Sequence, residues 1–344
     1  MKKLAVLISS LLVSISLLTG CSGGSSSSAP QSDSAASKSA SQETSAGDGE
    51  KVKIGLVQIV EHYSLNQIRE SFMEEMKVLG YTDDQAEIEY ANASGDQSNL
   101  NSICQKFAGD EKDLVVAIAT PSAQAAAAAA PNIPLVFSAV TDPVAAKLVT
   151  DPNAPDGLIT GTSDAIPVDQ VFSLVKQLTP DVKTVGFIYN LGEVNSVSVI
   201  DQAKQYCDEI GLNYVEATVT NSSEVQQAAQ SLADKCEAFY TPIDNTVASA
   251  MAAYAEVAKQ AKIPIYTGAD SMVIDGGFAT VGIDYTLLGK QTAQMAAKIL
   301  SGTAVKDVPV ETLSDFSTII NKTTAEAIGV TIPEDLKSSS QIVE

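Results

Sequence analysis

The sequence predicts an α/β protein made of two doubly wound lobes, in which parallel strands are covered by helices on both faces. Short apolar segments typical of buried strands alternate with amphipathic helical segments along most of the chain. This alternation runs twice, from about residue 52 and again from about residue 183, and an aperiodic segment at 151–170 separates the runs. The chain between residues 52 and 337 is also long enough for two ordinary domains.

The N-terminal segment has the features of an export signal. Lys2 and Lys3 precede an apolar run, Leu4–Leu18, which has the length of a signal peptide and is short for a membrane span. The following Leu-Thr-Gly-Cys resembles the bacterial lipobox, in which the cysteine, here Cys21, becomes the lipidated first residue of the mature protein. We therefore predict a signal peptide over 1–20 and a protein held on the extracytoplasmic face of the membrane.

The segment after Cys21 is rich in Ser, Ala and Gly and has almost no large apolar residues. Such a composition cannot bury enough surface to offset the entropy of ordering. We predict a disordered, lipid-anchored tether over 21–51. The alternative is an ordinary cleaved signal peptide that happens to be followed by a cysteine.

The first run of strands and helices starts directly after the tether. Lys53–Ile59 is expected to be a strand, and the helix at 64–80 follows because its apolar residues recur on one face. Ser64 and Gln67 resemble a capping box at its start. The remaining elements expected in this run are strands at 86–93, 113–119 and 133–140, a helix containing Cys104 and Phe107 before the second of these strands, an alanine-rich helix at 122–130, and a short helix at 141–149 capped by Asp142.

The second run repeats the same alternation. Its expected strands are 183–190, 213–220, 237–243, 263–269 and 278–284, and its expected helices are 196–212, 222–236, 245–263 and 285–300. Such alternation indicates parallel sheets covered by helices on both faces, and the two runs predict two doubly wound domains.

Composition excludes several functions. The net charge is −21, with no basic stripe, so a nucleic-acid partner is not expected. The chain has one arginine, Arg69, and one histidine, His62, and no cluster of His and Cys with metal spacing. Apart from Cys21, the cysteines are odd in number, and we expect Cys104, Cys207 and Cys236 to be buried free thiols.

The loops after the expected strands are polar. They read QIVEHYS, ATPSAQ, FSAVTDP, YNLGEVNS, TPIDNT and TGADSM. In open α/β sheets, ligands bind beyond the carboxyl ends of the strands. A single polar residue in such a loop is more often a helix cap than a ligand contact, but six polar loops at one crevice favour a binding site.

These loops, together with ITGTSD and GGFATVGIDYTLLG, resemble the extracytoplasmic solute-binding lipoproteins of ABC transporters, specifically the tryptophan/tyrosine-binding type. The resemblance covers nearly the whole folded body. It implies the type I periplasmic binding protein fold, with two Rossmann-like lobes joined by three crossovers around a ligand cleft. It also implies a monomer that captures a free aromatic L-amino acid and delivers it to a membrane permease, without cofactor, metal or catalysis.

On this chain, the resemblance implies one lobe over 52–163 plus 281–313, a second over 164–280 plus 314–337, and a tail at 338–344. It implies ligand contacts from both lobes. The implied contact residues are Gln58, His62, Ser122, Ser138, Thr141, Asn190, Glu193, Asn195, Asp244, Asn245 and Asp270.

A zwitterionic ligand fits the chemistry of these loops. The helix that opens at Thr120-Pro121-Ser122 offers free N–H groups and hydroxyls for a carboxylate. Glu193, Asp244 and Asp270 are candidate partners of the ammonium group, and the sequence does not choose among them.

Three alternatives remain open from the sequence. A nucleoside or another small solute could occupy the same fold. A surface enzyme is disfavoured because no nucleophile elbow or phosphate-binding loop is present. An additional adhesin role is not excluded.

Overall fold

The computed structural model describes residues 50–344 of the 344-residue chain. The predicted signal peptide, the predicted lipidation site Cys21 and nearly all of the predicted tether lie outside the described residues. The strands are β1 Val52–Gln58, β2 Ala86–Asn92, β3 Leu114–Ile118, β4 Leu135–Ser138, β5 Ile159–Ser163, β6 Thr184–Asn190, β7 Asn213–Val219, β8 Ala238–Thr241, β9 Ile265–Thr267, β10 Ala279–Gly282, β11 Glu311–Thr312, β12 Ser317–Asn321 and β13 Gln341–Val343.

Helices follow most of these strands. They are α1 Tyr63–Val78, α2 Gln97–Gly109, α3 Thr120–Ala129, α4 Val168–Leu178, α5 Val194–Ile210, α6 Val225–Leu232, α7 Asn245–Ala248, α8 Met251–Ala261, α9 Asp270–Ile274, α10 Tyr285–Leu300, α11 Lys322–Ile328 and α12 Glu334–Ser339, with 3-10 turns at Ser222–Glu224 and Val305–Asp307.

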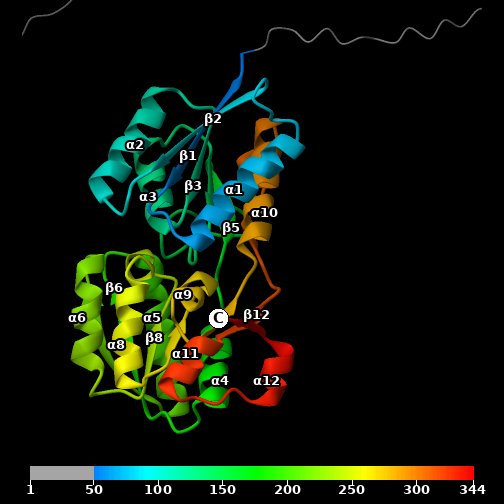
Figure 1. The fold of residues 1–344 in the computed structure, drawn as a ribbon. Helices are drawn as coiled ribbons and strands as arrows, with labels where there is room; N and C mark the ends of the chain where they lie inside the picture. The colour runs from blue at the N-terminus through cyan, green and yellow to red at the C-terminus, as the bar shows by residue number, and fades with distance from the viewer. Residues whose placement is uncertain (1–49) are drawn as a thin grey trace, which may run out of the picture. The chain divides into compact units, whose positions relative to one another are not determined.

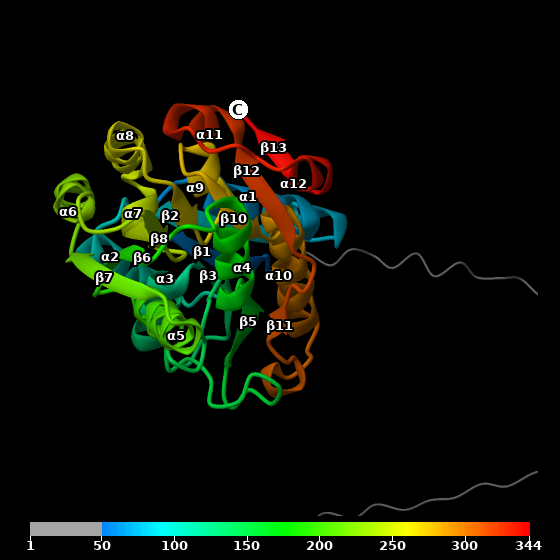
Figure 2. The ribbon, with the colours of Figure 1, turned by 90° about the horizontal axis from the view of Figure 1, so that it is seen from below.

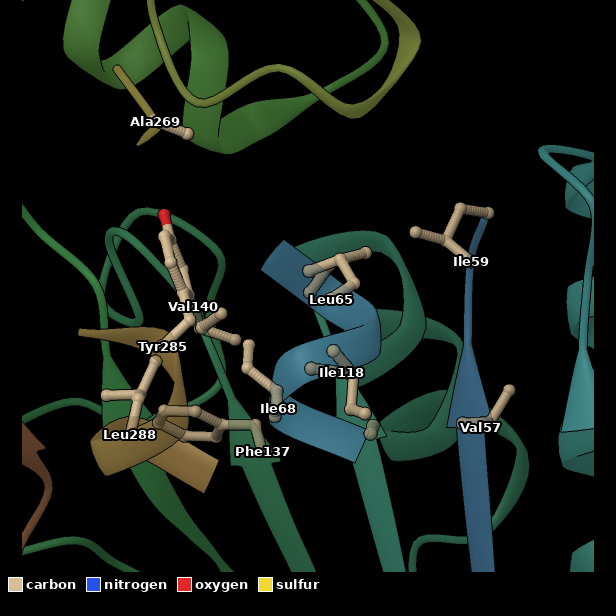
Figure 3. Close-up of a cluster of buried hydrophobic side chains, with 14 of the residues drawn as sticks. Val57, Ile59, Leu65, Ile68, Ile118, Phe137, Val140, Ala269, Tyr285 and Leu288 are labelled. Atoms are coloured by element: carbon tan, nitrogen blue, oxygen red, sulfur yellow. The ribbon is translucent and has the colours of Figure 1, made fainter. Parts of the chain in front are cut away.

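The strands form two sheets, and each sheet is the centre of one lobe. The first lobe has the strand order β11-β5-β4-β3-β1-β2, and the second has the order β13-β12-β10-β9-β8-β6-β7. All pairings are parallel except that of β10 with β12. Figure 1 shows the lobes as separate layers of strands and helices, and Figure 2 shows α8 and α11 on one side of the second sheet and α4 and α5 on the other. The predicted class of two doubly wound α/β lobes is confirmed.

Burial explains why these segments fold as they do. Every residue of β3 is buried, as expected for a central parallel strand covered on both faces. Helix α1 buries one face, including Ile68, Phe72 and Met76, and packs along α10. Gly289 allows this close packing, because an added Cβ there would lie 2.1 Å from Ser71 Oγ and 2.5 Å from the carbonyl oxygen of Ile68.

Two local predictions at helix starts are wrong. Ser64 does not cap α1, because the helix already begins at Tyr63 and His62 occupies the cap position without a side-chain bond. The Ser64 hydroxyl instead donates to Asp270 in the other lobe. The helix predicted at 141–149 is a series of turns, although Asp142 does accept from the backbone N–H of Ala145.

The structure contains elements that the sequence pattern did not reveal. Strand β5 and the start of α4 lie within the segment predicted as an aperiodic crossover. At the C-terminus, residues assigned to a tail include β13, which pairs with β12. The predicted lobe boundary between residues 280 and 281 falls inside β10, a strand of the second sheet.

The chain passes between the lobes three times. These passages follow β5, follow β10 and precede β12, at about residues 163–168, 282–285 and 312–317. Cys104, Cys207 and Cys236 are free and buried, as predicted. Burial raises the pKa of these thiols to about 11, about 12 and about 12, respectively. Within residues 50–344, no helix combines the length and apolarity needed to cross a bilayer.

Candidate ligand site between two lobes

The loops that follow the strands of the two sheets meet each other. Ser64 Oγ in α1 donates to Asp270 Oδ1 in α9 at 2.9 Å, and Ser198 Oγ in α5 donates to Asp142 Oδ2 after β4 at 2.6 Å. A pocket of about 500 Å³ is lined by loops of both lobes. It is lined from the first lobe by Ile59, Val60, Ser94, Gly95, Gln97 and Pro121, and from the second by Asn190, Gly192, Glu193, Thr220, Asn221, Ser222, Asn245, Thr246 and Ser249.

Glu193 and Asp244 are both held by donors of their own lobe. Glu193 Oε2 accepts from the backbone N–H and the side-chain Nδ2 of Asn245, at 3.0 and 2.7 Å, and Oε1 accepts from the N–H and hydroxyl of Thr246, at 2.9 and 2.8 Å. Asp244 caps α7 through the N–H of Val247 and also accepts from the N–H of Asn190. Burial and the neighbouring Glu193 charge raise the pKa of Asp244 to about 7.

The predicted asparagines belong to the same wall of the second lobe. Asn190 donates to the Thr246 hydroxyl at 2.7 Å and accepts from the N–H of Gly192. Asn195 donates to the carbonyl of Ile243 at 2.7 Å, and its buried Oδ1 has no hydrogen-bond partner among residues 50–344. That free acceptor can take a donor from a ligand.

The first lobe presents Gln58 and His62 at the end of β1. Gln58 donates to the carbonyl of Val60 and to Asn66 Oδ1, while its buried Oε1 has no partner in the described part of the chain. Burial lowers the pKa of His62 to about 4, an effect partly offset by the side chain of Asn245 from the second lobe. His62 is therefore neutral at physiological pH and can donate and accept without bringing a charge.

The start of α3 has the properties predicted for an anion site. The cap residue is Ala119, with φ of 77°, and it has no side chain that could bind the free N–H groups of the first turn. The hydroxyls of Thr120 and Ser122 are buried and have no partner within residues 50–344. Unused donors at the start of a ten-residue helix favour a carboxylate.

Ser138 and Thr141 are engaged within the first lobe. The Ser138 hydroxyl lies 2.8 Å from that of Thr292 and 3.3 Å from that of Thr162, which forms a fully buried cluster joining β4, β5 and α10. Thr141 donates to Asp164 Oδ1 at 2.8 Å. Both hydroxyls therefore already have partners in the fold.

Asp270 differs from the other acidic candidates because it lies in the second lobe and accepts a hydrogen bond from the first. Its Oδ1 accepts from Ser64 Oγ and from its neighbour's N–H, that of Ser271. Burial raises its pKa. Arg69, by contrast, pairs with Glu61 and Glu70 and also donates to the Tyr90 hydroxyl, so this arginine is occupied in α1 of the first lobe.

Two buried residues near this site were not among the predicted contacts. Asp164 directly follows β5, and sequence reasoning missed it because the strand itself was not recognised. Tyr285 opens α10, and its buried hydroxyl has no partner in the described chain. Only Tyr285 had a usable signal, since it closely follows β10, a strand that the sequence did predict.

This architecture is that of a two-lobed ligand-binding protein with the type I periplasmic binding fold. Solved structures with this fold include a 5-methylthioribose-binding transporter protein from Thermotoga lettingae, at 17% identity and a TM-score of 0.57, which shows likeness of fold alone.

The family is shown by a match over residues 53–343 to the model described as ABC transporter substrate binding protein, and the chain belongs to this family. A "Tyrosine-binding protein" from Clostridioides difficile (strain R20291) is 41% identical over 329 residues, which cover 95% of this chain and 92% of that protein. As a family member, the chain is the extracytoplasmic substrate-binding component of an ABC transporter and works with a small-molecule ligand and a membrane permease.

Two solved relatives differ in state. One is an ABC domain in complex with L-Trp from Streptococcus pneumonia, at 37% identity and a TM-score of 0.83, covering 86% of this chain and all of that one. The other is a ligand-free, open substrate-binding protein with adhesive properties from Clostridium difficile, at 40% identity and a TM-score of 0.66, covering 85% of this chain and 99% of that one.

Proposed function

We propose that this protein captures a free aromatic L-amino acid, tyrosine or tryptophan, between its lobes and delivers it to the permease, as a lipid-anchored monomer without catalytic activity. The observation that carries the proposal is the set of buried, unpartnered polar atoms that both lobes present at the strand ends. Relatives of similar length, one named for tyrosine and one with L-Trp bound, favour this ligand class.

The residues divide into an anion end and a cation end. Thr120, Ser122 and the free N–H groups of α3 suit the ligand carboxylate, and Gln58 and Asn195 offer acceptors for other polar groups of the ligand. A carboxylate of the second lobe suits the ammonium. No arginine is required, which is consistent with the pairing of Arg69 elsewhere.

Calorimetry on the purified protein tests the ligand. L-Tyr or L-Trp should bind well above L-Leu, the D-enantiomers and nucleosides. The Arg69→Ala variant should bind nearly as tightly as the wild type, because its guanidinium is held by Glu61 and Glu70. Tight nucleoside binding, with no heat from any aromatic amino acid, would overturn the proposal in favour of the nucleoside alternative.

We also propose that binding closes the cleft by hinge motion at the three passages between the lobes. Closure is supported by the better superposition of this chain on the L-Trp-bound relative than on the open one, although their sequence identities are similar. A ligand that contacts both lobes binds the closed arrangement preferentially, and this difference shifts the population.

The proposed anchor is tested by Cys21→Ser. The variant should leave the membrane fraction and appear in the soluble fraction, with ligand binding unchanged, because residues 49–344 form a compact unit of their own. Fractionation and immunoblotting measure the change, with Ser22→Ala as the control that keeps the cysteine. Retention of Cys21→Ser in the membrane would contradict lipid anchoring at this residue.

A further inference from the structure

Two side-chain hydrogen bonds join one lobe to the other. Ser64 Oγ in α1 donates to Asp270 Oδ1 in α9 at 2.9 Å. Ser198 Oγ in α5 donates to Asp142 Oδ2, in the segment after β4, at 2.6 Å. Among residues 50–344, the pocket of about 500 Å³ is lined by other side chains than these four. Both bonds therefore connect the lobes beside the pocket rather than within its lining.

The two bonds lie on opposite faces of the sheets. Helix α1 packs on α10 and contacts α9, whereas α3 packs on α2 and contacts α5. Figure 2 shows α1 and α9 on one side of the strands and α3 and α5 on the other. The closed arrangement is thus held on both faces, and moving the strand ends of the two lobes apart breaks both bonds.

The hydroxyl of Ser198 makes an unusual choice of partner. A serine inside a helix often donates to the carbonyl four residues earlier, as Ser102 does in α2. The carbonyl of Val194 offers Ser198 the same bond in α5, but the hydroxyl donates to the other lobe instead, and within residues 50–344 this is its one hydrogen bond. The side chain is therefore oriented by the first lobe and not by its own helix.

Asp142 is held in place by the segment 139–147, which we call the latch loop. The backbone N–H of Ala145 donates to Asp142 Oδ1 at 2.9 Å, which leaves Oδ2 for the contact with α5. Ala139 and Lys147, at the two ends of the latch loop, have φ of 55° and 60°, a left-handed conformation that residues other than glycine rarely adopt. Such residues persist where the surrounding structure fixes them.

The latch loop is fixed by the rest of the first lobe. Gln124 Nε2 in α3 donates to the carbonyl of Ala146 at 3.2 Å. Ser163 Oγ donates to the carbonyl of Thr141 at 3.1 Å, and the Thr141 hydroxyl donates to Asp164 Oδ1 at 2.8 Å. Ser163 ends β5 and Asp164 begins a passage between the lobes. One loop is thus bonded to a passage between the lobes and also carries an acceptor for the second lobe.

We infer that the bond from Ser198 to Asp142 is an interlobe latch, which stabilises the closed arrangement without touching the ligand. The inference rests on the proposed closure of the cleft and adds residues that set its equilibrium. When only the closed arrangement binds tightly, the apparent affinity scales with the closed fraction before binding. A hydrogen bond to a carboxylate is stronger than one between neutral groups, and this one is partly buried.

Calorimetry on Ser198→Ala tests the latch without altering a predicted ligand contact. The variant should weaken L-Tyr and L-Trp binding by the same factor, about 3- to 20-fold, because the lost bond favours closure and not a particular ligand. Ser102→Ala is the matched control, since Ser102 is an exposed helical serine bonded within α2, and its affinities should stay within about 1.5-fold of wild type. Unchanged affinity in Ser198→Ala, or a loss for one ligand alone, would overturn the inference.

A double-mutant cycle tests whether Asp142 is the partner that matters. In an Asp142→Ala background, the Ser198 hydroxyl has lost its acceptor, so adding Ser198→Ala should change affinity by less than about 1.5-fold. The cycle also cancels the loss of the bond from Ala145 to Asp142, which both backgrounds with alanine at this position share. A second substitution as costly as the first would show that Ser198 acts through another group and would overturn the inference.

Hydrogen exchange of the ligand-free protein separates the latch from the proposed ligand. Opening exposes the strand-end loops of both lobes, so Ser198→Ala should speed amide exchange by about 3- to 20-fold at 59–64 and 190–195, and leave the core strand β3 unchanged. Mass spectrometry of peptic fragments measures this. Unchanged exchange, or acceleration confined to α5, would overturn the latch even if L-Tyr binds. Acceleration in both lobes, with neither L-Tyr nor L-Trp bound by the wild type, would support the latch while the ligand proposal fails.

Discussion

Replacing Glu193 by alanine is expected to destabilise the protein by about 3–5 kcal/mol and to remove most ligand binding. The side chain is 5% exposed and accepts four hydrogen bonds from Asn245 and Thr246. Alanine would leave two backbone N–H groups at the start of α7 without an acceptor, and each such loss costs about 1–3 kcal/mol. The start of α7, which places Asn245 near His62, would lose its fixed position as well.

Urea unfolding followed by circular dichroism measures the cost. Glu209→Ala is the control, because this glutamate lies in α5, the helix that Glu193 precedes, and is exposed. It should change the free energy of unfolding by less than about 0.5 kcal/mol. Glu193→Gln keeps one acceptor oxygen and should fall between the two. An alanine variant as stable as the Glu209 control would show that water replaces the carboxylate without loss.

Gly161→Ala is expected to prevent stable folding or to cost more than about 4 kcal/mol. Gly161 pairs with Phe137 across β4 and β5, and a Cβ built on it would lie 2.0 Å from the Phe137 carbonyl oxygen and 2.6 Å from two ring atoms. The first of these neighbours is backbone in a central sheet, so it cannot move aside as a flexible side chain could. Strand β5 also leads into one passage between the lobes, so both packing and hinge geometry would suffer.

Soluble yield and thermal unfolding check this expectation. Gly157→Ala is the matched control, since Gly157 lies four residues earlier with φ of 85° and has open space around a built Cβ. In that variant, only the strain of an alanine in the left-handed backbone conformation is expected, and it reduces the free energy of unfolding by about 1–2 kcal/mol. If Gly161→Ala folded with a loss no greater than that of Gly157→Ala, β4 and β5 would have to separate more easily than their register indicates.

The sequence predicted the lobes because most strands are apolar runs between amphipathic helices. Strand β5, Ile-Thr-Gly-Thr-Ser, was not predicted because its burial does not depend on large apolar side chains. Its threonines are buried through hydrogen bonds, Thr160 to the carbonyl of Val308 and Thr162 to the hydroxyl cluster. Two of these partners, Val308 and Thr292, lie more than a hundred residues away along the chain, so no local sequence pattern could predict the strand.

The same reasoning limits what could be predicted of the site. Polar residues after strands indicated the right loops, and the pocket brings Asn190, Glu193 and Asn245 together. The presence of a serine or threonine in a loop could not show that Ser138 is already hydrogen-bonded to Thr292, or that Thr141 is hydrogen-bonded to Asp164. Whether a polar group is free depends on neighbours distant in the chain, and the individual ligand contacts stay predictions until they are measured.

The three buried cysteines have a practical consequence for watching the protein work. Their thiols are enclosed and their pKa values lie near 11 or 12, so little thiolate is available to alkylating dyes at neutral pH. In a Cys21→Ser background, a new cysteine at Val78 on one lobe and another at Leu191 on the other, which are 78% and 56% exposed, would be the reactive sites. A donor and acceptor dye pair placed there would report lobe movement by energy transfer in single molecules, with the native cysteines left in place.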